Sequence, residues 1–260
     1  MLVFAFWGLL RSLDHTIQNL ENHVLKRFPD AQIFVHTYTT LEKYTNTRAQ
    51  EYNLTLDCSP AKLRPTFFES DDLMQTRETL NFQQYHSKPD PWNNNYATLN
   101  NFVCAMYSKL RVTQMVQAQN LNPSHVVFLR PDVLFLAPLT YDFLKLSNPF
   151  SWVIPNFHLM NGFNDRFCIA SAQNYVDYGS VFHVLLPYSR VLPLHSETMY
   201  GAYAKMKRIN LQYIVFPFVR IRATGKMEVR DHELYAKAQT QLVKSKQQVV
   251  RRRMAGRRFH

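Results

Sequence analysis

Short apolar runs alternate along this chain with longer segments of helical periodicity, and this alternation limits the folds open to it. The runs at residues 2–6, 31–38 and 124–129 have the length of strands. Between the last two, residues 96–119 repeat apolar side chains every three or four positions, as a helix does. Short buried strands separated by helices are typical of α/β domains, so we expect a mixed sheet flanked by helices.

Weaker patterns predict the remaining elements. Residues 39–92 contain four prolines and predict loops with one or two short helices. In chain order we also expect a helix from Ser12 or Asp14 to Phe28, extended chain at 133–136, a strand at 152–155, a polar loop at 156–166, a helix from Asp165 or Ser171 to Tyr178, a helix at 195–209 and a strand at 215–221.

The length and the charge distribution indicate one domain with a basic extension. The chain has 260 residues, 46% of them hydrophobic, which suits a single large core. We assign residues 1–230 to this domain and 231–260 to a C-terminal helix and basic tail. Residues 244–260 hold seven of the eleven net positive charges, so the other 243 residues carry only +4. Nucleic acid is therefore not expected as a partner of the domain, although a basic tail can bind RNA or an anionic membrane.

Several classes of site are excluded by the glycines and cysteines. No two of the six glycines lie closer than 17 residues, so the glycine-rich phosphate loops and the GxSxG elbow are absent. Cys58, Cys104 and Cys168 have neither zinc-site nor disulfide-scaffold spacing. No apolar run approaches the ~20 residues that span a bilayer, and the N-terminus lacks a cleavage site. We expect a cytoplasmic protein without a transmembrane segment.

The ends of the predicted strands carry the first candidate site residues. In open α/β sheets, ligands bind beyond the carboxyl ends of the strands. Arg11 and Arg130 follow two of these strands and can pair with phosphate oxygens. Tyr38 can stack on a base, and Asp132 can bind a divalent cation or a sugar hydroxyl. The alternative is structural: Arg130 pairs with Asp132, and Tyr38 is a core aromatic residue.

Two further groups of polar residues contain candidate carboxylates. Asp165 lies between Asn164 and Arg166, and suits a general base or an anchor for a sugar hydroxyl. Alternatively, Asp165 caps a helix. Glu197 opens a predicted helix, where it can reach an acceptor hydroxyl, and His195 beside it can bind phosphate or metal. Capping is again the alternative role.

Taken together, these motifs resemble a known enzyme family. In their order and spacing they are similar to small GT-A-fold glycosyltransferases of large algal viruses, including the chlorella viruses, and of related microbial sequences. The resemblance covers roughly residues 3–225. The segments that carry it are FAFWGLLRS at 4–12, VHTY at 35–38, FLRPDVLF at 128–135, NGFNDRF at 161–167 and HSE at 195–197.

The resemblance implies a GT-A, Rossmann-like sheet and a nucleotide-sugar donor, with a UDP-sugar such as UDP-xylose expected. The sugar would pass to a hydroxyl of a growing glycan on a viral glycoprotein, in the host cytoplasm. Nucleotide-sugar contacts are implied for Trp7, Gly8, Arg11, Thr37, Tyr38, Arg130 and Asp132, with Arg111 or Lys109 near the diphosphate. Contacts with the acceptor or the sugar are implied for Asn161, Asn164 and His195.

The resemblance also bears on metal and mechanism. Arg130-Pro131-Asp132 stands where the family has Asp-x-Asp, so Mn²⁺ or Mg²⁺ is expected to be weakly held by Asp132 and phosphates, or dispensable. Arg130 would help neutralise the leaving diphosphate. If the enzyme inverts, Asp165 or Glu197 takes the proton of the acceptor, and Asp165 is favoured because the polar loop around it can surround a sugar. If the enzyme retains, both only bind hydroxyls. The competing functions are a nucleic-acid-binding protein or a nucleotidyltransferase that uses the basic tail.

Overall fold

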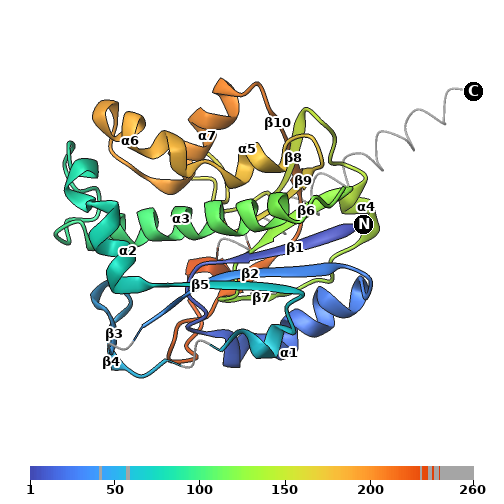
Figure 1. Cartoon of the computed structure of the whole chain (residues 1–260), viewed down its shortest axis with the longest axis horizontal. Coiled ribbons are helices and arrows are strands. Elements are labelled where there is room, and N and C mark those ends of the chain that lie inside the picture. The colour runs from blue at the N-terminus through green and yellow to red at the C-terminus, as the bar shows by residue number, and fades with distance from the viewer. Residues whose placement is uncertain (41–42, 57–58, 229, 234–235, 237–239, 241–260) are drawn as a thin grey trace, which may run out of the picture.

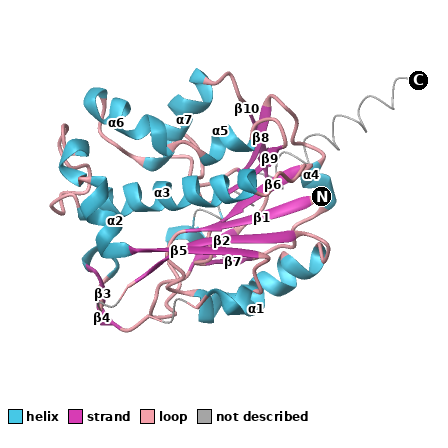
Figure 2. Ribbon diagram, viewed as in Figure 1, coloured by secondary structure: helices cyan, strands magenta, loops and turns pink. Residues whose placement is uncertain are grey.

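A seven-stranded mixed sheet forms the centre of the protein in the computed structural model (Figures 1 and 2). The structure describes residues 1–240 except 41–42, 57–58, 229, 234–235 and 237–239, so Cys58 and the basic tail lie outside the described residues. Six strands run parallel and β9 runs antiparallel to both neighbours, which confirms the predicted α/β class. In sheet order the strands are β10 (Asn210–Ile214), β8 (Ser151–Pro155), β9 (Phe167–Ser171), β6 (His125–Leu129), β1 (Leu2–Trp7), β2 (Gln32–Thr39) and β5 (Phe67–Asp72).

Helices cover both faces of this sheet. On one face, α3 (Ala97–Ala118) lies along the strands, with α5 (Tyr175–Gly179), α6 (Phe182–Val191) and α7 (Ser196–Met206) beyond it (Figure 1). On the other face lies α1 (Leu13–His23), next to a small antiparallel sheet of β7 (Val133–Phe135) and β11 (Phe218–Arg220). The other described elements are α2 (Leu73–Leu80), α4 (Tyr141–Leu144) and the antiparallel pair β3 (Tyr44–Asn46) and β4 (Glu51–Leu54).

The first strand shows why both faces must be covered. Val3, Ala5 and Trp7 point into the core below α3, whereas Phe4 and Phe6 point into the core below α1. All five are almost fully buried. Because successive side chains of a strand alternate between faces, a continuous apolar run needs packing partners on both sides. The two cores account for the apolar, non-alternating sequence of this strand.

Most predicted elements are confirmed, with some corrections. The strands expected at 2–6, 31–38, 124–129 and 152–155 and the helix at 96–119 are present. The helix expected from Asp165 is wrong, because residues 167–171 form β9 inside the sheet and α5 begins only at Tyr175. The first helix ends at His23, followed by a short 3-10 turn, and not at Phe28. Strands β5 and β10 and helix α6 were not expected.

The end of the proposed domain lies next to a buried ion pair. The proposed division at residue 230 stays a prediction, and Asp231, just after it, is fully buried against Arg220. Across the part of the chain that the structure describes, no helix combines the length and the apolar character needed to cross a membrane.

Candidate functional site

The candidate residues gather at one edge of the sheet because of the strand directions. The parallel strands β1, β2, β6 and β8 all end at this edge, and the antiparallel β9 begins there. In register, Leu129 at the end of β6 lies beside Phe6 of β1 and beside Phe167 of β9. The segments that follow these ends therefore meet, as expected of a ligand site in an open α/β sheet.

A cavity of about 360 Å³ opens at this edge. Trp7, Gly8, Arg11, Tyr38 and Arg130, all predicted to bind the nucleotide-sugar, line it. Among the residues that the structure describes, no Asp or Glu lines it, although the domain as a whole carries many acids. The cationic side chains of the lining are seven: Arg11, Lys43, Arg48, Arg77, Arg130, Arg220 and Arg222.

Two of these arginines share one buried carboxylate. Arg11 Nη2 lies 3.0 Å from Asp132 Oδ2, and Arg130 Nε donates to Asp132 Oδ1 at 2.8 Å. Arg130 Nη2 also donates to Oδ2. Burial alone would raise the pKa of Asp132, but the charges of Arg130 and Arg11 outweigh it and hold this pKa well below its ordinary value. Both roles considered for Arg130 thus hold together: it pairs with Asp132 and it lines the cavity.

This pairing does not suit a metal ion at Asp132. Both carboxylate oxygens accept hydrogen bonds from guanidinium groups, and the residue is 1% exposed. Mg²⁺ and Mn²⁺ need open oxygen ligands, so a cation here would have to displace an arginine. The described residues also contain no group of three or more His, Cys, Asp or Glu side chains placed to hold a metal. The residues present therefore do not fit the expected cation.

A buried polar row holds the loop after β1. Gly8, at φ 91°, donates its N–H to Ser108 Oγ at 2.8 Å. Ser108 Oγ lies 2.8 Å from His36 Nδ1, and His36 Nε2 lies 3.2 Å from Asp71. Ser108 and His36 are fully buried, and burial lowers the pKa of His36 to about 4. The row has the order of a hydrolase triad but no access to substrate, so its role is to position the backbone of Gly8.

Two other predicted nucleotide residues lie outside the cavity lining. Thr37 is 1% exposed, on a strand inside the sheet. Arg111 points from α3 toward β5, where it lies 2.9 Å from Glu69 and 3.4 Å from Asp71. The structure thus places neither Thr37 nor Arg111 where the resemblance implied.

Lys109, the alternative to Arg111, is fully buried behind Trp7. Its Nζ lies 4.0 Å from the centre of the Trp7 ring, 4.4 Å from that of Tyr178 and 4.6 Å from that of Tyr200. It donates to the Tyr200 hydroxyl at 2.5 Å and approaches the backbone oxygen of Asp165 at 3.5 Å. Burial lowers its pKa to about 7, partly opposed by the charge of Asp165. Lys109 supports the Trp7 wall and does not itself line the cavity.

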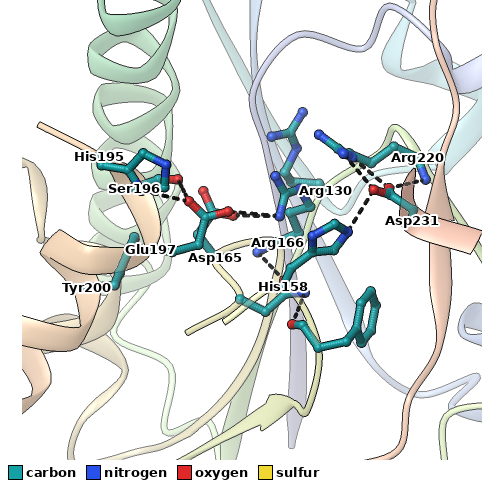
Figure 3. A network of polar contacts seen from close by, with 12 residues as sticks. Arg130, His158, Asp165, Arg166, His195, Ser196, Glu197, Tyr200, Arg220 and Asp231 are labelled. Carbon is teal, nitrogen blue, oxygen red and sulfur yellow. Dashed lines mark hydrogen bonds and ion pairs between the residues drawn. The ribbon is translucent and has the colours of Figure 1, made fainter. Parts of the chain in front are cut away.

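The two candidate catalytic carboxylates meet at one arginine (Figure 3). Arg166 Nη1 lies 3.2 Å from Asp165 Oδ1 and 3.4 Å from Glu197 Oε1. Glu197 Oε2 accepts from the Ser196 hydroxyl and lies 3.3 Å from His195 Nδ1. Burial would raise the pKa of Asp165, but the positive charges of Arg166, Arg130 and Lys109 lower it. The structure brings Asp165, Glu197 and His195 together, although none of them lines the cavity.

A close backbone approach holds this loop against α7. A Cβ atom on Gly162 would lie 1.6 Å from the backbone oxygen of Glu197, and one on Gly201 would lie 2.8 Å from Gly162 Cα. Phe163 N–H donates to the same Glu197 oxygen at 3.3 Å. Two glycines facing each other therefore let the loop reach the start of the helix, which places Asp165 beside Glu197.

The two asparagines of the loop have different surroundings. Asn164 is fully buried, donates to the Phe157 oxygen at 3.1 Å and accepts from Arg166 N–H at 3.0 Å. Its side chain is thus used within the loop and is not open to a sugar. Asn161 is exposed, at φ 63°, and does not line the cavity.

An aromatic row that the sequence analysis missed connects the cavity with the carboxylates. The guanidinium carbon of Arg48 lies 5.9 Å from the centre of the Trp92 ring. Trp92 stacks on His195, with ring centres 5.5 Å apart and planes at 17°. His195 in turn contacts Glu197. The sequence signal for Trp92 was a lone tryptophan in a polar loop bounded by prolines.

The C-terminal part of the described chain supplies another wall of the cavity. Arg220 on β11 donates through its backbone N–H and its Nε to Asp231, at 2.9 Å and 2.6 Å. His158 Nε2 lies 2.7 Å from the same carboxylate (Figure 3). Burial would raise the pKa of Asp231, but its contacts with His158 and Arg220 hold it far below the ordinary value. Arg222 follows and pairs with Glu228. The sequence analysis assigned no site role to this segment.

Comparisons with known proteins give distant structural similarity only. No family model matches the chain, and no curated protein matches it. Its structure is similar to that of galactosyltransferase LgtC in complex with donor and acceptor sugar analogues, at 11% identity and a TM-score of 0.45, over 82% of this chain and 73% of that one. It is also similar to mouse xyloside xylosyltransferase 1 in its apo form, at 9% identity and a TM-score of 0.43, over 82% and 84% of the two chains. Similarity at this level assigns neither an activity nor a substrate.

Proposed function

We propose that this chain is a glycosyltransferase that uses a nucleotide-sugar donor. The observation that carries the proposal is the cavity at the carboxyl edge of the sheet, which in the described part of the chain is lined by seven cationic side chains and by no carboxylate. Such a lining suits a ligand with at least two phosphates. The resemblance of the five sequence segments to small glycosyltransferases supports the same conclusion, because Arg11 and Arg130 belong to these segments and line the cavity.

The diphosphate of the donor would bind at Arg11 and Arg130. These two guanidinium groups share the single negative charge of Asp132, so the three groups together keep a net positive charge. Gly8 has no side chain and lets a phosphate approach the backbone closely. Trp7 and Tyr38 form part of the cavity wall, but they are only 1% and 2% exposed, and the Tyr38 hydroxyl donates to the backbone oxygen of Cys104. Tyr38 is thus a core aromatic residue at the wall, and stacking of the base on either ring is not part of the proposal.

In the proposed reaction, an acceptor hydroxyl attacks the anomeric carbon of the donor sugar. The bond between this carbon and the diphosphate oxygen breaks, and the nucleoside diphosphate leaves with the bonding electrons. Arg11 and Arg130 would stabilise the charge that develops on the leaving oxygens. No step is assigned to a metal, since the residues present do not fit one.

The proton of the acceptor hydroxyl needs a base if the reaction inverts. We assign this role to Glu197 and not, as expected from the sequence, to Asp165, because Glu197 is linked to Arg48 of the cavity through His195 and Trp92. The lowered pKa of Asp165 makes that carboxylate the weaker base, and it would bind a sugar hydroxyl. If the reaction retains, both carboxylates bind hydroxyls only.

Ligand binding tests the proposal directly. Thermal unfolding is measured with UDP, GDP, CMP and a short RNA, each with EDTA and with Mn²⁺. We expect UDP to stabilise the protein equally in both conditions, by about 2.7 kcal/mol at 100 times its Kd, which raises Tm by several degrees. Stabilisation by RNA and by none of the nucleotides would instead support the nucleic-acid-binding alternative. A strict requirement for Mn²⁺ would contradict the assignment of the diphosphate to the two arginines.

Transfer from radiolabelled UDP-sugars then tests the base. Glu197→Gln is expected to lower kcat at least a hundredfold in an inverting enzyme, with the affinity for UDP unchanged. Near-wild-type turnover in both Glu197→Gln and Asp165→Asn would refute a general base at this place. Four finer points stay predictions from the sequence. They are uracil as the nucleobase of the donor, xylose as the sugar, a glycan on a viral glycoprotein as the acceptor, and the cytoplasmic location.

A further inference from the structure

The cavity holds more positive charge than a diphosphate requires. Arg11 and Arg130 share Asp132, Arg220 pairs with Asp231, and Arg222 pairs with Glu228. The other three lining cations, Lys43, Arg48 and Arg77, form no ion pair with any carboxylate that the structure describes. Among the described residues the seven cations thus form ion pairs with three carboxylates, and the cations without a carboxylate partner leave a surplus of positive charge beside the proposed diphosphate site.

Much of this surplus is concentrated around Arg48. Burial and the like charges of Arg222, Arg166 and Arg230 lower the pKa of Arg48, whereas the charge of Glu197 raises it. Arg222 already pairs with Glu228, and Arg166 pairs with Asp165 and Glu197. Arg48 lines the cavity without an ion pair to any described carboxylate, so its guanidinium is open to an anionic group of the ligand.

Arg48 and Arg222 form a cationic cluster, and the structure holds this cluster in place from two sides. Arg48 lies in a 3-10 turn, Thr47–Ala49, which begins with Asn46 accepting a hydrogen bond from Ala49 N–H at 3.3 Å. Arg222 lies in the C-terminal segment, whose Ala223 N–H donates to the buried carboxylate of Glu51 at 2.5 Å. Glu51 belongs to β4, directly after the turn, so this hydrogen bond ties the turn that carries Arg48 to the segment that carries Arg222.

The cluster lies on the acceptor side of the proposed site. Arg48 contacts the Trp92 ring, and the row of Trp92, His195 and Glu197 continues from there to the proposed base. Trp92 is partly exposed. An aromatic ring beside an arginine is suited to a sugar ring that carries an acidic group, since the sugar stacks on the aromatic ring and the acid pairs with the guanidinium.

We infer that one substrate of this site carries an anionic group in addition to the donor diphosphate, bound by Arg48 with Arg222. The group is a carboxylate or a phosphate, either on the transferred sugar, as in a uronic acid, or on the acceptor. The inference rests on the proposed function and narrows its substrate class from sugars in general to acidic or phosphorylated ones.

Calorimetric titration separates the two sources of the anion. The donor arm compares UDP-glucuronic acid with UDP-glucose, which differ in one carboxylate. The acceptor arm, in the presence of UDP, compares glucuronic acid and glucose 6-phosphate with glucose. We expect an acidic probe in at least one arm to bind about tenfold more tightly than its neutral counterpart, with a stronger dependence on salt.

Variants locate the preference at the cluster. Arg48→Gln is expected to abolish the preference for the acidic probe, and Arg48→Lys to keep part of it, with the affinity for UDP changed less than twofold in both. Arg27→Gln serves as the matched control, because Arg27 is exposed and lies before β2, at the opposite edge of the sheet. It should leave all affinities unchanged.

The outcomes distinguish failure of the inference from failure of the proposed function. If UDP binds but acidic and neutral probes bind alike in both arms, the second anion site is refuted and the donor site stands. The inference also fails if the Arg48→Gln variant keeps the preference for the acidic probe. It fails as well if this variant binds UTP more weakly but binds the acidic probes as before, because Arg48 would then contact a third phosphate. If no nucleoside diphosphate binds, the proposed function itself fails.

Discussion

Asp132 shows how one buried side chain organises the site at the scale of single residues. It is the only described carboxylate that contacts both Arg11 and Arg130, and it holds their guanidinium groups at the cavity wall. Its negative charge lowers the energetic cost of burying the two arginines. Because one carboxylate pairs with two guanidinium groups, one positive charge remains for a ligand. The same residue therefore matters for stability and for binding.

Replacing Asp132 by Asn should destabilise the protein strongly. Removal of one partner from a buried ion pair leaves uncompensated charge, which costs about 3–5 kcal/mol. Urea unfolding measures this loss. Asp142→Asn, which removes an exposed carboxylate 2.8 Å from Lys145, is the control and should have no measurable effect. Equal stabilities of the two variants would contradict the role assigned to Asp132.

The burial of Lys109 is expected to make the stability of the protein depend on pH. Its pKa falls from 10.5 in the unfolded chain to about 7 in the folded protein because it is buried. Between these values the unfolded state binds more protons, so the free energy of unfolding should rise as the pH increases from about 7 toward 10. The buried thiols of Cys104 and Cys168 oppose this rise from about pH 9, and Tyr178 and Tyr200 oppose it from about pH 10, since burial raises the pKa of all four groups.

Urea midpoints at pH 7, 8 and 9 test this prediction. Lys109→Met should flatten the rise, because the ionisable group is gone while an unbranched apolar side chain fills the space between Trp7, Tyr178 and Tyr200. Parallel pH profiles of the two proteins would show that Lys109 does not titrate in this range.

At the scale of elements, the contact between the loop at 156–166 and helix α7 determines how the two candidate carboxylates lie. The loop supplies Asp165 and Arg166, and the helix supplies Glu197. Gly162 and Gly201 permit the contact, because neither position has room for a Cβ atom.

Gly201→Ala should therefore reduce activity more than stability. The new Cβ would lie 2.8 Å from Gly162 Cα and push the loop away from α7, at a cost of about 1–3 kcal/mol. The better helix propensity of Ala returns about 1 kcal/mol of this. Transfer activity should fall at least tenfold, because Arg166 no longer aligns both carboxylates.

The matched control for this variant lies on the same helix. Ala202 is exposed, so Ala202→Gly should cost about 1 kcal/mol through helix propensity alone. We expect nearly normal transfer from this control when both variants are assayed well below their Tm. Equal activity losses would show that the loss in Gly201→Ala comes from helix stability and not from the displaced loop.

The elements also show which structure the sequence could predict. The central strands β1, β2 and β6 are buried on both faces, and therefore appear as continuous apolar runs. The edge strands β5 and β10 are half exposed and rich in polar residues, so their strand character depends on a neighbour that the local pattern does not reveal. A five-residue run such as β9 is too short to be distinguished from part of a buried helix.

The residues of the candidate site also differ in how well the sequence predicts their places. Arg11 and Arg130 directly follow predicted strands, so their place at the cavity could be predicted from topology alone. Arg48, Trp92 and Arg222 come from connecting segments. Their places depend on tertiary contacts, such as the hydrogen bond between Ala223 and Glu51, that no local pattern indicates.

At the scale of the whole molecule, the location of the charge matters more than its total. Outside residues 244–260 the chain carries only +4, yet among the described residues seven cationic side chains and no carboxylate line one cavity. A concave, cationic wall concentrates the field at the place where the ligand enters. The basic tail lies outside the described residues, and its seven charges lie in a different part of the sequence from the cavity cations.

Deletion of residues 241–260 separates these two sets of charges. The shortened chain loses seven positive charges but keeps every residue that lines the cavity. We expect its affinity for UDP to stay within twofold of that of the full chain, measured by calorimetry at two salt concentrations. Any binding of RNA to the full chain should weaken, and the slope of log K against log salt should become flatter, because fewer phosphates are neutralised. If UDP binding were lost instead, the tail would belong to the nucleotide site. If RNA binding persisted and UDP competed with it, the cavity would be a nucleic-acid site and the glycosyltransferase proposal would fail.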